Sequence, residues 1–141
     1  MKTDKEGFTL LELLIVIAII GILVAMGTVS YSTAQKKARD ATRRGDMKAI
    51  QNAFEQYYAA NSSSYPSSCP ASGGTLTIEP GNIFIIPTDP KNSGSWVYNP
   101  SGCSLITYCY CAFLEGGGGN SGVNCDFAAA TKNYFCVKSL Q

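Results

Sequence analysis

The run FTLLELLIVIAIIGILVAM, residues 8–26, is almost wholly apolar and limits the folds open to this chain more than any other feature. It approaches the length of about 20 residues that a helix needs to cross a bilayer. Glu12 nevertheless places a carboxylate inside it. Because burying an unpaired charge is costly, Glu12 needs either a position at the membrane edge, where its side chain reaches water, or a cation supplied from elsewhere.

Residues 1–7, MKTDKEG, are hydrophilic and end in glycine directly before the apolar run. A secretory signal has a shorter apolar stretch, followed by a small-residue cleavage site. Here the apolar run is longer than in such a signal. We therefore expect it to stay in the mature protein as a membrane-spanning helix.

Helical periodicity continues beyond the apolar run, because apolar side chains recur at steps of three and four residues with charges between them. These side chains are Met47, Ile50, Phe54, Tyr57 and Tyr58. No proline interrupts residues 8–61. We predict one continuous helix, apolar on every side over 8–30 and amphipathic over 31–61; a membrane anchor followed by a separate helix is the alternative.

Residues 62–141 carry short β-type runs between Pro- and Gly-rich turns. The runs TLTI and NIFII flank the turn EPG, and SWVY and SLITYCYCAFLE flank NPSG. A last strand is expected in the second part of FAAATKNYFCVKSL. We predict an α+β fold, in which a small antiparallel sheet, stapled by disulfides, packs on the upper half of the long N-terminal helix.

All six cysteines lie in this second half of the chain: Cys69, Cys103, Cys109, Cys111, Cys125 and Cys136. An even number in one small region indicates disulfides formed in an oxidising compartment, with many pairings open. Cys109 and Cys111 point to the same face of a predicted strand, and a bond between such neighbours is strained. We expect each to pair elsewhere. Metal binding is the alternative, weakened by the absence of histidine and of a second close-spaced cysteine pair.

The absence of histidine also argues against an enzyme, and we expect no catalytic residue. The net charge is +1, which gives no general reason for nucleic-acid binding. The basic residues cluster after the apolar run: Lys36, Lys37, Arg39, Arg43, Arg44 and Lys48. Such a stretch can touch DNA, but it more often forms a solvated face or pairs with acids of a neighbouring subunit, so DNA binding is not predicted.

The segment KEGFTLLELLIVIAIIGILVAM resembles the class III signal of type IV pilins and type II secretion pseudopilins. The shared features are a short charged leader, a glycine before a phenylalanine, a glutamate four residues after that phenylalanine, and an apolar helix. The stretch IPTDPKNSGSWVYNPSG is similar to the segment after the helix in major pseudopilins and related pilins.

This resemblance implies that a membrane-embedded prepilin peptidase cuts between Gly7 and Phe8 and methylates the new amino terminus of Phe8. It assigns Glu12 to a pair with the amine of a neighbouring subunit in a helical filament of identical chains. The pair would form only on assembly, and a slip of one residue would lose it. Glu12 would therefore fix the stagger between subunits.

The resemblance further implies a single-pass prepilin in the inner membrane, which later joins a filament at the cell surface. An inner-membrane assembly platform and an external ATPase motor would drive assembly, because nothing in this chain resembles a phosphate-binding loop. We expect a structural pilin of a type IV pilus. The alternatives are a major pseudopilin of a type II secretion system and a single-span, membrane-anchored binding module that does not polymerise.

No cofactor is expected. Major pseudopilins often bind calcium in the loop after the sheet, and the candidate ligands here are Asp89, Glu115 and Asp126. Calcium takes roughly six to eight oxygen ligands, so three carboxylates form a weak site and no metal is predicted.

Overall fold

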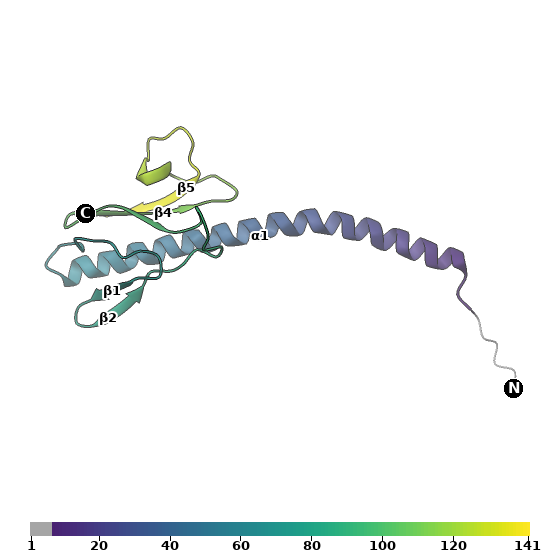
Figure 1. Ribbon diagram of the computed structural model, residues 1–141, viewed down its shortest axis with the longest axis horizontal. Coiled ribbons are helices and arrows are strands. Elements are labelled where there is room, and N and C mark those ends of the chain that lie inside the picture. Colours follow the sequence, from purple (N-terminus) through teal and green to yellow (C-terminus); the bar gives the residue numbers. More distant parts are fainter. Residues whose placement is uncertain (1–6) are drawn as a thin grey trace. The chain divides into compact units, whose positions relative to one another are not determined.

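The computed structural model describes residues 7–141, and its longest element is the helix α1 (Leu10–Ala60), of 51 residues. Figure 1 shows α1 as one helix, which confirms the predicted continuous helix. Its end is set locally: Ser62 and Ser63 adopt positive φ angles of 53° and 56°, which an α-helix cannot contain. The side-chain amide of Asn61 donates a hydrogen bond to the backbone carbonyl of Tyr57 over 3.0 Å, and so satisfies one of the last carbonyls of the helix.

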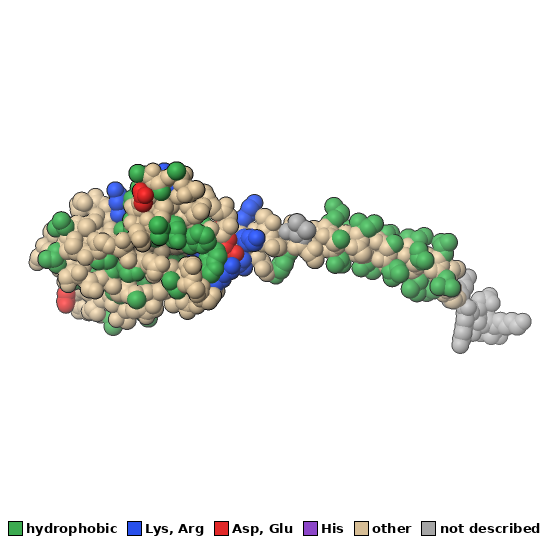
Figure 2. Space-filling model, turned by 45° about the horizontal axis from the view of Figure 1, so that its top comes forward, with side chains coloured by type: hydrophobic (Ala, Val, Ile, Leu, Met, Phe, Trp, Pro, Cys, Tyr) green, Lys and Arg blue, Asp and Glu red, His purple; other side chains and the backbone are tan. Residues whose placement is uncertain are grey.

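The chain divides into two compact units after Gln35, and each is described by itself. In the first unit, the apolar side chains of α1 up to Met26 are exposed on every side of the helix. Figure 2 shows these hydrophobic side chains, in green, along the first part of α1. By length and composition, α1 contains one candidate membrane span, and none of that span is buried within the chain. Lipid or other protein must therefore cover it.

The second unit, residues 36–141, is called the head below. It contains the last part of α1 and two antiparallel sheets. The strands are β1 (Thr75–Ile78), β2 (Asn82–Ile85), β3 (Asn99–Ser104), β4 (Thr107–Phe113) and β5 (Tyr134–Lys138), and a short 3-10 helix, η1, spans Val123–Cys125. β1 pairs with β2, and β3, β4 and β5 form the other sheet in that order. The predicted hairpin around EPG and the predicted last strand are confirmed.

The predicted strand SWVY is wrong, because the strand of this region is β3, which begins at Asn99 and contains the predicted turn NPSG. Side-chain packing, and not strand pairing, holds the segment before β3: Trp96 packs edge-on against Phe113, and Tyr98 is fully buried. β3 then pairs with β4 through a register irregularity, at which Gly102 adopts a φ of 63°. A glycine accepts this conformation without steric cost, as a β-bulge requires.

The core of the head lies between the end of α1 and the β-sheets. Met47, Ile50 and Phe54 are completely buried, as their helical spacing predicted. Tyr108 and Tyr110 of β4 pack against Phe54, with ring centroids 4.4 and 5.3 Å from its own. These five residues, from one face of α1 and one strand, therefore lie at the centre of the core. The part of α1 from residue 36 onward belongs to the head.

Candidate functional site

Glu12 lies in the first turn of α1 and bonds to Thr9 in both directions. Glu12 Oε2 accepts hydrogen bonds from the backbone N–H and the hydroxyl of Thr9, each over 2.9 Å, and Thr9 Oγ1 accepts one from the Glu12 N–H over 3.2 Å. This reciprocal arrangement is a capping box, which satisfies two amide groups that a helix start leaves free. This cap was not predicted, although Thr9-Leu10-Leu11-Glu12 has the required spacing.

The predicted cleavage site lies just before this cap. Gly7 and Phe8 precede α1, and the Phe8 side chain is 87% exposed. A Cβ added to Gly7 would meet nothing within 4 Å, so packing in this chain does not require glycine there. The rest of the predicted leader, residues 1–6, lies outside the described residues. Cleavage and methylation stay predictions.

A second group of charged residues in the head surrounds a buried arginine, and we call it the charged network. Its members are Arg39, Asp40, Arg43, Asp89, Lys91 and Glu115. Arg43 is at its centre and is completely buried. Its Nε and Nη2 donate to the two oxygens of Asp89 over 2.6 and 3.0 Å, and its Nη1 donates to Asp40 over 2.8 Å and to Glu115 over 3.0 Å.

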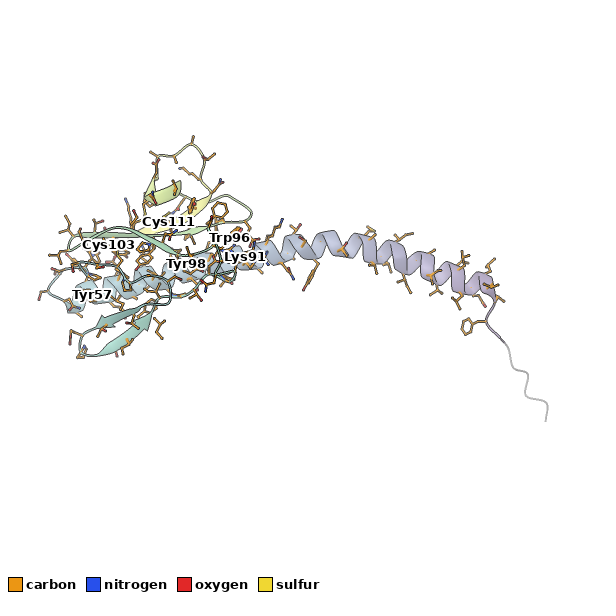
Figure 3. The ribbon with its side chains drawn as sticks, in the orientation of Figure 1. Tyr57, Lys91, Trp96, Tyr98, Cys103 and Cys111 are labelled. Atoms are coloured by element: carbon orange, nitrogen blue, oxygen red, sulfur yellow. A yellow bond between two sulfur atoms is a disulfide. The ribbon has the colours of Figure 1, made fainter. Side chains whose placement is uncertain are left out.

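Glu115 connects the network to two further cations. Both of its oxygens accept hydrogen bonds from Arg39, over 2.5 and 2.8 Å, and Lys91 Nζ lies 3.0 Å from Oε2. Lys91 and Arg43 also lie over the ring of Trp96, at 4.1 and 4.5 Å from its centroid. Figure 3 shows Lys91 and Trp96 beside α1. The network thus ties α1 to the loop before β3 and to the loop after β4.

In the charged network, the pKa values of the Asp89 and Glu115 carboxylates lie below the ordinary range. Hydrogen bonds from Arg39 are the main cause for Glu115, helped by Lys91 and Arg43 and opposed by burial. Burial would by itself raise the pKa of Asp89, but hydrogen bonds from Arg43 and from the Lys91 backbone outweigh it. Both groups therefore favour the ionised form in the folded head.

The basic stretch after the apolar run is largely used inside the head. Arg39 and Arg43 belong to the charged network, and Arg44 donates to the carbonyl of Gly118 over 2.9 Å. Lys48 donates to the side chain of Gln51 over 3.1 Å. Most basic residues of this stretch therefore have partners within the same chain. This finding adds no support to DNA binding.

The three calcium candidates are not gathered into one cluster among the described residues. Asp89 and Glu115 share the charged network, where arginine and lysine groups bind their oxygens. Asp126 lies in the loop after η1 and accepts a hydrogen bond from the Ala128 N–H over 3.0 Å. The expectation of no cofactor stays a prediction.

The six cysteines form three disulfides: Cys69–Cys103, Cys109–Cys125 and Cys111–Cys136. The prediction that Cys109 and Cys111 pair elsewhere is confirmed. The sulfur atoms of the last two disulfides all lie within 4.8 Å of one another. A soft metal would need thiolates at this position, and sulfurs bonded to each other carry none.

Residues 2–28 match a protein family described as the prokaryotic N-terminal methylation motif. Over 113 residues, the chain is 32% identical to a fimbrial protein of Dichelobacter nodosus, and the match covers 77% of this chain and 69% of that protein. It is 31% identical over 110 residues to type II secretion system core protein G of Escherichia coli, which covers 70% of this chain and 75% of that protein.

A third relative, type II secretion system core protein G of Pseudomonas aeruginosa, is 35% identical over 66 residues. That match covers 47% of this chain and spans about half of the relative, 46% of its length. A comparison with solved structures finds no match.

Proposed function

Because this chain belongs to the family of type IV pilins and type II secretion pseudopilins, we propose that it is the structural subunit of a type IV pilus. In this proposal, prepilin peptidase removes residues 1–7 and the mature chain begins at a methylated Phe8. The mature chains then polymerise into a helical filament at the cell surface. The chain itself has no enzymatic role and needs no cofactor.

The observation that carries the filament role is the exposure of α1 over the apolar run. The apolar side chains of residues 8–26 are exposed all around the helix, and none of this span is buried within the chain. A bilayer covers such a helix before assembly, and a bundle of identical helices covers it afterwards. Glu12 gives this otherwise uniform surface a single charged position, which favours one stagger between neighbours.

Three disulfides support a surface pilus over a pseudopilus. All six cysteines of the head are bonded, and a subunit exposed outside the cell gains most from covalent cross-links. The relatives include both classes of protein, so the choice of a pilus rests on this argument. An inner-membrane assembly platform and an ATPase motor are the further partners that we propose.

The test is the intact mass and the N-terminal peptide of the chain in material sheared from the cell surface. We expect a species that begins at methylated Phe8 and carries three intact disulfides. A chain found only in membranes with Met1 or Lys2 still present would overturn the pilin role and leave a membrane-anchored module. A processed chain confined to the cell envelope would instead favour the pseudopilus.

A further inference from the structure

Two disulfides of the head lie in direct contact with each other. β4 supplies Cys109 and Cys111, which share one face of the strand, while β5 supplies Cys136 and η1 supplies Cys125. The sulfurs of Cys111 and Cys125 belong to different disulfides, yet they lie only 3.3 Å apart. Figure 3 labels Cys111 at this place on the sheet. We call these four residues the sulfur cluster.

The close contact between Cys111 and Cys125 makes a second pairing of the four cysteines possible, and this pairing would link the same secondary-structure elements. In the observed pairing, Cys109 ties β4 to η1 and Cys111 ties β4 to β5. If Cys111 bonded to Cys125 and Cys109 to Cys136, β4 would still be tied once to η1 and once to β5. The closed loops would change little in length, so the restriction on the unfolded chain would be similar.

The third pairing is different in kind. It would join Cys109 to Cys111 on the same strand, which is strained, and Cys125 to Cys136. β4 would then lose its covalent ties to both neighbours. The fold therefore discriminates against this pairing. Of the other two, the strand register favours the observed one, because Cys136 lies opposite Cys111 and Lys138 lies opposite Cys109. The four sulfurs nevertheless all lie within 4.8 Å of one another, so the second pairing needs only short movements of the side chains.

The sulfur cluster is open to a small reagent on one side. A cavity of about 330 Å³ is lined by Cys109, Cys125, Phe127 and Lys138, among others. Cys125 is half-buried, whereas the other three cysteines of the cluster are buried. Lys138 lies opposite Cys109 in the ladder between β4 and β5 and also lines the cavity. The Lys138 Nζ lies over the ring of Phe127, 5.2 Å from its centroid.

We propose that the sulfur cluster is a thiol–disulfide exchange site, at which a small-molecule thiol interconverts the two pairings without unfolding the head. The site acts independently of the assembly role proposed above. A thiolate attacks the Cys125 sulfur, forms a mixed disulfide there and releases the Cys109 thiolate. That thiolate attacks Cys136 and releases Cys111, and the Cys111 thiolate then attacks Cys125 and expels the original thiol. The thiol is recovered, so no net oxidation or reduction occurs.

The first test uses the full-length chain in detergent under native conditions. A catalytic amount of glutathione is added, free thiols are blocked by alkylation at intervals, and the unreduced protein is digested with pepsin. The acidic digest prevents further exchange, and cleavage after Tyr110 separates Cys109 from Cys111. We expect peptides linked through Cys111–Cys125 and Cys109–Cys136 to appear beside the native pairs. Persistence of the native pairs alone overturns the proposal, and so does any new link to Cys69 or Cys103.

A pair of variants tests the contact itself. The double substitution Cys109→Ser with Cys136→Ser removes one cysteine from each native disulfide and leaves Cys111 and Cys125. We expect these two to bond, so that alkylation adds no mass. The matched control, Cys103→Ser with Cys125→Ser, leaves Cys69 and Cys109 without bonded partners, and alkylation should add two labels.

Two alkylated thiols in a folded chain that carries Cys109→Ser and Cys136→Ser would contradict the proposal. Near-ultraviolet circular dichroism reports whether that chain is folded. If it is not, the glutathione experiment on the unmodified chain decides the matter by itself.

Discussion

Glu12 has one partner in the single chain and a different one in the proposed filament. Substituting Glu12→Gln separates the two, because glutamine also completes a capping box but carries no charge. We expect the Glu12→Gln chain to reach the membrane at normal levels and to form few or no filaments, since the neighbour's amine loses its carboxylate. Electron microscopy and immunoblots of sheared material measure this.

The matched control for Glu12→Gln is Thr9→Ala, which removes the cap and keeps the charge. It should weaken the start of α1 by about 1 kcal/mol and still allow filaments. Glu12→Lys, which reverses the charge, should stop assembly as well, whereas a membrane-anchored module would tolerate it. Normal filaments from Glu12→Gln would show that Glu12 serves the helix cap and not the contact between subunits.

Arg43 is the residue on which the interior of the head most depends. Arg43→Met keeps much of the side-chain volume but leaves Asp89, Asp40 and Glu115 without their shared cation. Breaking a buried ion pair on one side typically costs about 3–5 kcal/mol, and we expect a loss of this size in the free energy of unfolding. Urea unfolding of the full-length chain in detergent, followed by near-ultraviolet circular dichroism, measures it.

Arg44→Met is the control for Arg43→Met on the neighbouring residue. Arg44 bonds to one exposed carbonyl and lies over the ring of Phe135, so its loss should cost well under half as much. Equal effects of the two substitutions would contradict a central role for Arg43.

At the scale of elements, the charged network joins α1 to two loops, and its strength depends on pH. The pKa values of Asp89 and Glu115 are lowered on folding, so the unfolded chain binds more protons in acid. The stability that they contribute is complete above the unfolded pKa of about 4 and is lost as the pH falls further toward their folded values. We expect the unfolding temperature to be level from pH 7 to about pH 5 and to drop below about pH 4.

Thermal unfolding of the full-length chain between pH 7 and pH 2 tests this dependence. Glu115→Gln should lower the unfolding temperature at neutral pH and make its decline in acid shallower. An unfolding temperature that stays level down to pH 2 would count against the network, as would an unchanged acid slope in Glu115→Gln.

For the molecule as a whole, the two compact units differ in the surroundings that they suit: the first exposes apolar side chains, and the second buries them in a core of its own. The buried core and the charged network both lie within residues 36–141, while the exposed apolar side chains of α1 lie mainly before residue 28. We expect a chain shortened to residues 36–141 to be soluble without detergent, monomeric and fully disulfide-bonded. Light scattering after size exclusion, together with a thiol assay, measures this.

The full-length chain, transferred to the same buffer without detergent, is the comparison and should aggregate. Aggregation or free thiols in the shortened chain would mean that the head needs the first part of α1 to fold.

The amino-acid sequence by itself determined the features that depend on neighbours along the chain. The apolar run, the helical spacing of Met47, Ile50 and Phe54, and the absence of proline predicted α1 correctly. The cap at Thr9 was equally readable, because its two partners are three residues apart. The hairpin around EPG followed from the same local logic.

Tertiary structure alone decided what joins distant residues. Arg43 meets Asp89 across 46 residues and Glu115 across 72, and no local pattern marks the three as partners. The packing of Trp96 against Phe113 and the burial of Tyr98 shifted the strand from SWVY to β3, because side-chain packing outweighed the β propensity of that run. The choice among disulfide pairings likewise required the sulfurs to be placed in space, since the spacing of six cysteines along a chain does not say which of them meet.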